Sequence, residues 1–363
     1  MKQGVIKNDT AASFSSSASS INNGSDSASA YLWLSVPFNN DGSVYMKAEG
    51  MYKYDAYLYF TNPVTFVDSQ IADIDLLKFA GEFKNDDGNI SFSAGRFSIS
   101  DLTSTIFAQN CDGVFVKYAN LSVEVNGYAG YTGLINGNVV SMINSPDLSF
   151  NKTQVYSLSP MYVPVNATVS FPALFANQTL SVQAAAFFDL NGTSYNRYYG
   201  TLSLTGPFTT SVYYSAFATA GFSTFKSASP ELSFLGNAAL TIFPSPSLFI
   251  SVACKVASWD MGFIKPFNGF TSSTLFTGKE FTGCIMPALS VTTSINKANV
   301  VISGKGVIGH NGTKLEFEGI SADLTMSINI FSDFTFGLTI TDSYMAVAGN
   351  NTASGTLKLA FSF

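Results

Sequence analysis

The C-terminal segment of the chain alternates strictly between large apolar side chains and polar or small ones. One face of an extended strand would carry Leu357, Leu359, Phe361 and Phe363, and the residues between them would lie on the other face. A period of two is the signature of a half-buried β-strand. The pattern therefore predicts a terminal strand that ends on an aromatic residue.

Segments of the same alternating kind recur along nearly the whole chain. Tight connections such as Asn39–Gly42 and Asn85–Gly88 follow every second segment, and Asp-Gly between alternating segments is the strongest short-range hairpin signal. Longer stretches separate the hairpins: 61–74, 100–112, 133–160, 223–230, 260–279 and 345–354. Counting the segments predicts 18 strands, with 16 as the alternative because Gly4 to about Ser17 and Glu280 to Ser294 are weakly patterned.

This arrangement predicts an all-β fold, a single closed antiparallel transmembrane β-barrel over residues 1–363. Charged residues make up only 12% of the chain and the mean hydropathy is +0.22. No window, however, offers the roughly 18 consecutive apolar residues of a membrane helix. A barrel explains both facts, because alternate residues face lipid and all backbone groups pair within the sheet. The alternative is a large soluble β-solenoid or sandwich whose outer face is unusually apolar.

Two segments are expected to lie outside the strands. The Ser-rich stretch near residues 13–30 is predicted to be an exposed loop or arm, because its composition excludes a helix. The segment 133–160 is predicted to be a long loop and is the candidate to constrict the pore. Short connections at one rim and long loops at the other are typical of outer-membrane barrels.

Charged side chains agree with this assignment of faces. When the apolar face of each segment is turned toward lipid, the charges fall on the other face, which avoids a cost of about 2–4 kcal/mol at the bilayer midplane. The exception is Arg96, which is in phase with Phe92, and a bulge at Gly95 would turn it inward. The inward charges nearly balance, which predicts weak ion selectivity. The pore-lining candidates are Lys47, Glu49, Lys53, Lys78, Glu82, Arg96, Lys117, Glu124, Lys255, Lys305, Glu316 and Glu318.

The sequence offers little for catalysis or metal binding. His310, the only histidine, lies in a predicted turn. The three cysteines, Cys111, Cys254 and Cys284, fit neither a disulfide framework nor a zinc site. The net charge of −6 leaves no basic stripe of the kind that nucleic-acid binding requires. We therefore expect no enzyme activity, no cofactor, no metal and no nucleic-acid partner.

Several short motifs carry a resemblance to a known group of proteins. These are Ala94-Gly95-Arg96-Phe97, Asp112-Gly113-Val114 and Gly130-Tyr131-Thr132-Gly133, together with the terminal strand. The run of about 40 residues resembles porin-like outer-membrane β-barrel proteins of spirochaetes, and the last strand resembles the signal read by the bacterial barrel-assembly machinery. The resemblance implies an outer-membrane location and a signal peptide that is absent from this chain and presumed removed. It gives Arg96 either a place in the pore constriction or a rim salt bridge with Asp101 or Asp112.

The function expected from these features is passive diffusion of small hydrophilic solutes through a wet pore, since barrels of 16–18 strands leave an aqueous channel. Outer-membrane lipid is an expected partner, and an oligomer of identical chains is left open. Inward aromatic residues such as Tyr128 and Phe187 are expected to fill space beside a folded-in loop rather than to form a sugar-stacking path. The alternative functions are a surface-exposed adhesin or structural barrel with a plugged pore, and a gated transporter for hydrophobic compounds.

Overall fold

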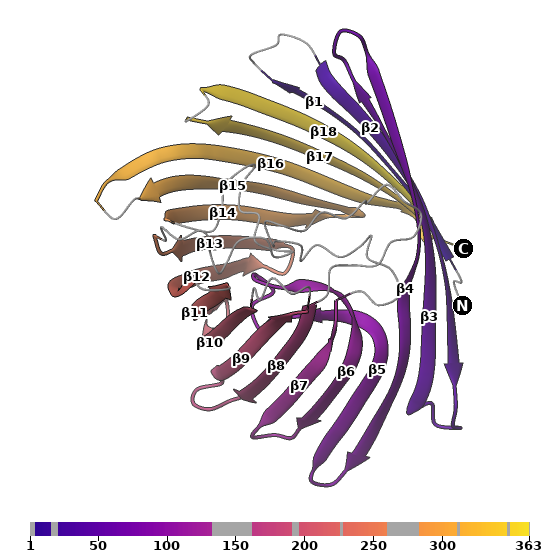
Figure 1. Cartoon of the computed structure of the whole chain (residues 1–363), viewed down its shortest axis with the longest axis vertical. Helices are drawn as coiled ribbons and strands as arrows, with labels where there is room; N and C mark the ends of the chain where they lie inside the picture. The colour runs from indigo at the N-terminus through magenta and orange to yellow at the C-terminus, as the bar shows by residue number, and fades with distance from the viewer. Residues whose placement is uncertain are drawn as a thin grey trace.

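The computed structural model describes residues 4–15, 21–132, 162–190, 196–225, 228–259, 283–310, 313–346 and 349–362. These residues form strands of one antiparallel sheet that curves around an interior (Figure 1). The strands are β1 (Gly4–Ser15), β2 (Ile21–Pro37), β3 (Val44–Tyr59), β4 (Thr65–Asn85), β5 (Gly88–Ser100), β6 (Ala108–Ala119), β7 (Glu124–Tyr131), β8 (Tyr162–Phe171), β9 (Thr179–Asp189), β10 (Asn196–Thr209), β11 (Val212–Phe225), β12 (Ala228–Ser245), β13 (Leu248–Ala257), β14 (Cys284–Ile295), β15 (Ala298–His310), β16 (Leu315–Phe331), β17 (Phe334–Met345) and β18 (Asn350–Ser362). Among the described residues, no helix is long and apolar enough to cross a membrane.

Strand order in the sheet follows the order along the chain. Each strand pairs with the next, and β1 pairs with both β2 and β18. The register between the first and last strands runs from Val5 opposite Ser362 to Ser15 opposite Thr352. Sequential antiparallel pairing of this kind needs only hairpin connections, which is why tight turns and alternating segments in the sequence were sufficient to predict it.

The two faces of the sheet differ in chemistry as the period-two pattern predicts. Leu324 on β16 stands opposite Ile340 on β17, and both side chains are exposed on the outer face. The adjacent pair on the inner face is Asp323 and Thr341, whose hydroxyl donates to the carboxylate over 2.7 Å. Paired residues on antiparallel strands share a face, so this division is propagated from strand to strand.

Side-chain hydrogen bonds fix the tight turn between β2 and β3. The side-chain oxygen of Asn39 accepts a hydrogen bond from the backbone N–H of Val44 over 3.0 Å. The Asp41 carboxylate accepts one from the backbone N–H of Ser43, also over 3.0 Å. Asn and Asp favour turns for this reason. The bonds from Ser43 also hold the pKa of the Asp41 carboxyl below its ordinary value. Gly42 has a φ of +70°, a conformation that glycine adopts without strain.

One hairpin leaves the wall of the sheet. β4 pairs with β5 only as far as Leu77 opposite Arg96, whereas β5 and β6 continue to pair with each other up to Ser100 opposite Ala108. β6 in turn pairs with β7 only from the position of Asp112 onward. Residues 97–111 therefore pair with no neighbouring wall strand, and Figure 1 shows β5 and β6 bending inside the curved sheet. We call this segment the inner hairpin.

Gly95 makes the departure of the inner hairpin possible. Its φ is +114°, and a Cβ atom there would collide with the carbonyl oxygen of Leu77. A residue with a side chain would thus strain the backbone where β5 leaves β4. The predicted bulge at Gly95 is wrong, because β5 keeps a continuous register with both neighbours. The register shift nearest to this position lies instead between β3 and β4, where Asp75 is the additional residue.

Several predicted loops are shorter in the structure than the sequence suggested. The Ser-rich stretch near 13–30 is largely strand, because β1 continues to Ser15 and β2 already begins at Ile21. The predicted loop 61–74 is likewise wrong for most of its length, since β4 begins at Thr65. Residues 223–225, 228–230 and 350–354 are also in strands. Backbone pairing extends these strands beyond the apolar positions, where side-chain pattern no longer marks them.

Candidate solute path

The inner hairpin bends into the interior and packs against β9. The backbone N–H of Leu102 donates to Oε1 of Gln183 on β9 over 2.9 Å. The Phe107 ring lies 5.1 Å from the ring of Phe187, which in turn lies 5.7 Å from that of Tyr199 on β10. The inward aromatic residues of β9 and β10 therefore fill space beside a folded-in segment, as expected.

Asp101 organises the tip of the inner hairpin. Its carboxylate accepts the backbone N–H groups of Thr103, Ile106 and Phe107 over 2.9, 3.0 and 2.7 Å. These bonds satisfy donors that a buried loop would otherwise leave without a partner. They also commit Asp101 to the loop backbone, which identifies its role as structural.

Arg96 lies at the base of the inner hairpin with no exposed surface. Its Nη2 atom is 3.3 Å from Oδ2 of Asp73 on β4, and both side chains are fully buried. Arg96 stands opposite Asp112 in the β5–β6 register. The buried geometry differs from an exposed rim salt bridge with Asp101 or Asp112, and it places the guanidinium at the anchor of the constricting segment.

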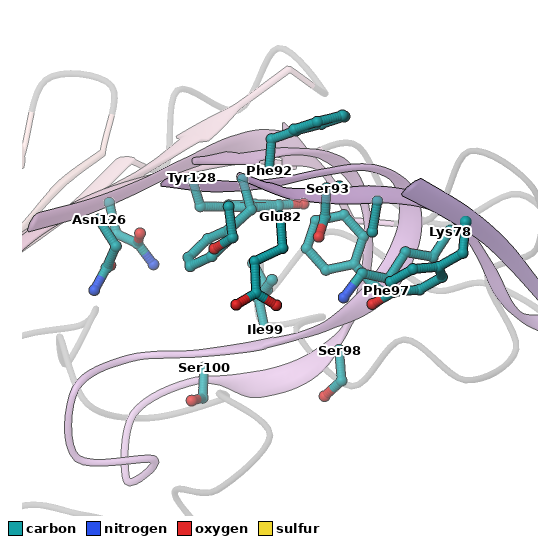
Figure 2. Close-up of a pocket in the computed structure, with 16 residues that line it drawn as sticks. Lys78, Glu82, Phe92, Ser93, Phe97, Ser98, Ile99, Ser100, Asn126 and Tyr128 are labelled. Atoms are coloured by element: carbon teal, nitrogen blue, oxygen red, sulfur yellow. The ribbon is translucent and has the colours of Figure 1, made fainter. Parts of the chain in front are cut away.

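A first cavity lies between the wall and the stem of the inner hairpin. It has a volume of about 440 Å³ and is lined by residues of β3 to β8, among them Lys78, Glu82 and Asn126. Figure 2 shows the wall side chains on one side of this space and Ser98 and Ser100 of the hairpin on the other. Hydroxyl, amide, ammonium and carboxylate groups thus surround a space large enough for a small polar molecule.

A second cavity lies at the tip of the hairpin, against strands β10 to β15. Its volume is about 570 Å³, and its lining includes Lys255, Lys305, Asn237, Thr103 and Thr105. Two ammonium groups, an amide and several hydroxyls line this space, and none of its described lining side chains is a carboxylate. Hydrogen-bond donors are therefore prominent among the described side chains of this cavity.

Many of the pore-lining candidates are engaged in ion pairs on the inner face. Lys53 lies 2.9 Å from Asp55, Lys117 lies 2.7 Å from Glu124, and Glu82 lies 3.1 Å from Lys84. These pairs neutralise charge locally and supply little net stability where they are solvated. The near balance of charge along the sequence is thus partly realised as contacts between neighbours.

Other candidates occupy distinct environments. Glu316 stands opposite Gly309, and Glu318 lies at the β15–β16 register shift with its carboxylate over Gly309, where a larger residue would collide with it. Glu49 on β3 lies next to Asp75, the additional residue of β4, and the two negatively charged carboxylates repel each other. His310, expected in a turn, instead ends β15, and its Nε2 atom lies 3.0 Å from the carbonyl oxygen of Ala257.

The terminal strand places its apolar residues on one face. Leu357 stands opposite Leu338 and Phe361 opposite Phe334 of β17, and both Leu357 and Phe361 are exposed. Leu359 lies between them on the same face. Lys358 projects to the other face, 3.9 Å from Asp9 of β1. Phe363 and the predicted constriction loop 133–160 lie outside the described residues, so their predicted roles stay predictions.

Sequence reasoning missed the features that shape the interior. Asp73, the partner of Arg96, falls within the predicted loop 61–74, and the sequence suggests Asp101 only as a partner for Arg96. The motifs around Gly95, Gly113 and Gly130 do not by themselves reveal that these glycines lie side by side. Those three glycines stand opposite one another on β5, β6 and β7, and the Tyr128 hydroxyl lies close to the last two.

The sequence matches no known protein-family model and no curated protein. Solved structures with the same fold do exist. Pseudomonas aeruginosa OccK7 (OpdD) superposes with a TM-score of 0.65 at 10% identity, covering 99% of this chain and 98% of that one. Pseudomonas aeruginosa OccK5 (OpdH) gives a TM-score of 0.62 at 9% identity, covering 100% and 98%.

A third structure extends the comparison. Pseudomonas aeruginosa OpdQ gives a TM-score of 0.62 at 11% identity, again covering 100% of this chain and 98% of that one. These neighbours are outer-membrane porins of the Occ group. At such low identity the likeness concerns the fold alone, and along nearly its whole length the chain has the all-β antiparallel fold of an outer-membrane porin.

Proposed function

We propose that the chain forms one closed, 18-stranded barrel in a bacterial outer membrane and conducts small hydrophilic solutes by passive diffusion. The observation that carries this proposal is the polar interior. The inner hairpin narrows the interior but leaves cavities of about 440 and 570 Å³ beside it. A structural barrel would have no need for polar space of this size.

Pairing of β1 with both β2 and β18 supports closure. A closed sheet has no free edge, which is the condition for a β-structure to remain in hydrocarbon. The outer face supports a membrane location, because exposed Leu, Ile and Phe side chains such as Leu324, Ile340 and Phe361 cover it. An aqueous surface would not favour so many exposed apolar side chains.

The solute class is suggested by the linings of the cavities. Both contain ammonium, hydroxyl and amide groups, which favour small solutes with several acceptors. One structural neighbour, Pseudomonas aeruginosa OpdK, was solved with vanillate and gives a TM-score of 0.59 at 9% identity. A small organic acid of this kind is a reasonable first solute to test on the present chain.

The plugged structural barrel or adhesin remains a second candidate because the inner hairpin packs across the interior. Phe107 is 1% exposed, and its contact with Phe187 joins the hairpin to β9. If this packing closed the interior completely, solutes would not pass and the outer loops would be the working surface.

Conductance in a planar bilayer distinguishes the two candidates. We expect the purified, folded protein to give open, ohmic current with weak ion selectivity. Replacing residues 99–109 by a short Gly-Ser linker should raise the conductance, because this segment occupies the interior. A silent bilayer for the native protein, with current appearing only in the shortened variant, would favour the plugged barrel. Silence in both would contradict the channel proposal.

Two further aspects of the proposal come from sequence resemblance. The chain is of spirochaete type, and its last strand is recognised by the barrel-assembly machinery. The terminal strand supports the second of these, since Leu357, Leu359 and Phe361 share one face next to β1 and β17. Assembly as a homo-oligomer is a separate question that size analysis in mild detergent would answer.

A further inference from the structure

A pair of lysines on the inner face stands out from the remaining charges. We propose that Lys47 and Lys78 together bind a compact oxyanion that carries two negative charges, of which inorganic phosphate is the simplest example. This inference rests on the proposed function, since it assigns a solute class to the same interior. It also modifies the expectation of weak selectivity, because it predicts one local site with a marked preference.

The two lysines face each other directly across neighbouring strands. Lys47 on β3 stands opposite Lys78 on β4. Opposed side chains on an antiparallel pair have Cβ atoms about 4.5–5.5 Å apart, and like charges in this position are destabilising. Within the described part of the chain, neither lysine forms an ion pair or a hydrogen bond. The arrangement therefore concentrates two positive charges at one place.

Aromatic rings hold both ammonium groups in position. Nζ of Lys47 lies 5.1 Å from the ring centroid of Tyr45, and Nζ of Lys78 lies 5.5 Å from that of Phe97 on the inner hairpin. A cation–π contact orients an ammonium group but leaves its charge and its N–H donors largely available. Both lysines are thus restrained without being neutralised.

Two other lysines on the inner face are paired with carboxylates, in contrast to Lys47 and Lys78. Lys53, on the same strand and face as Lys47, is paired with Asp55, and Lys117 is paired with Glu124. Glu82 lines the same cavity as Lys78, but its carboxylate already accepts the Asn89 amide over 2.8 Å and is paired with Lys84. The carboxylate nearest the cavity is therefore partly satisfied by other groups.

The first cavity supplies further donors around Lys78. Ser91 and Ser93 of β5 and Asn126 of β7 line it, and Figure 2 labels Ser93, Asn126 and Lys78 along the same side of the space. A dianion with three or four oxygens can accept from two ammonium groups and from hydroxyls at once. A monocarboxylate has fewer oxygens and half the charge, so it gains less from the paired lysines.

Phosphate titration in planar bilayers tests the inference. In a chloride background, phosphate should reduce the single-channel current in a saturable way, whereas acetate should do so only at about tenfold higher concentration. Lys47→Gln and Lys78→Gln should each raise the half-blocking phosphate concentration about tenfold, since each removes a charge-assisted contact. Lys53→Gln is the matched control, and it should change this concentration less than twofold.

Direct binding keeps the inference separate from the proposed channel function. Calorimetric titration of phosphate into the folded protein in detergent should show one site that is weakened by both lysine substitutions. Heat-dependent gel migration verifies folding, and Lys47→Gln decides alone if the Lys78 variant does not fold, because Lys47 is exposed. Lysine-dependent binding with a silent bilayer would refute the channel and support the site. The site would be overturned if the native protein neither bound phosphate nor was blocked by it. It would also be overturned if both folded variants bound phosphate, or were blocked by it, as strongly as the native protein.

Discussion

The buried ion pair at the base of the inner hairpin offers the sharpest test of the fold. Arg96 and Asp73 lie 3.3 Å apart, and neither side chain is exposed. Oδ1 of Asp73 has no hydrogen-bond partner among the described residues, so Arg96 is the group that compensates this buried charge. Arg96→Met removes that compensation but keeps most of the volume of the side chain.

The expected loss is large for a single substitution. Removing one partner of a buried ion pair costs about 3–5 kcal/mol, because the other charge stays buried without compensation. Replacing both residues, as in Arg96→Met with Asp73→Leu, should restore part of this loss, since apolar pairs often replace buried ion pairs at little cost. The double variant is therefore expected to be more stable than Arg96→Met alone.

Equilibrium unfolding in urea, in detergent micelles and followed by tryptophan fluorescence, measures these differences. The midpoint for Arg96→Met should fall well below that of the native protein, and the double variant should lie between them. Lys84→Gln is the control, because both side chains of its ion pair with Glu82 are exposed and the pair should contribute about 0–1 kcal/mol. A loss below about 1 kcal/mol for Arg96→Met would refute the buried, uncompensated charge. So would a double variant less stable than the single one.

Three further predictions concern packing, assembly and the faces of the sheet. Gly130→Ala should lower the unfolding free energy by about 1–3 kcal/mol because its Cβ would collide with an inward tyrosine hydroxyl, whereas Gly127→Ala, with its nearest contact at 3.6 Å, should be tolerated. Equal losses in the two glycine variants would contradict this packing. Phe363→Asp should block barrel assembly and abolish heat-dependent gel migration, and a variant that inserts normally would contradict the assembly signal. Leu324→Lys should cost about 2–4 kcal/mol in a bilayer and the neighbouring Thr325→Lys far less, and the reverse order would exchange the two faces.

The position of the inner hairpin changes where selectivity is expected to arise. From the sequence, the long segment 133–160 was the candidate constriction. The structure shows that residues 97–111 occupy the interior, with Leu102 and Phe107 in contact with β9. Solutes would have to pass the cavities beside this hairpin, so its stem and tip residues are the places where substitutions should alter conductance.

The sequence by itself determined the order of the strands and the chemistry of their faces. Strict alternation, as at Leu357, Leu359 and Phe361, depends only on the local two-residue period of a strand. Turn signals such as Asn39–Gly42 act over four residues and mark the hairpins directly. Strand ends were less predictable, because the backbone bonds that extend β2 and β4 leave no trace in the polarity of side chains such as Asp68 and Gln70.

Only the tertiary structure decided which charges meet and which remain without a partner. The nearly balanced list of inward charges could not show that Arg96 reaches Asp73, 23 residues away, or that Lys47 faces Lys78. Such contacts depend on register between strands, on the additional residue at Asp75 and on the sharp departure of β5 at Gly95. A one-residue change in register exchanges the two faces of a strand, so the sign and place of charge in the interior are fixed by pairing rather than by composition.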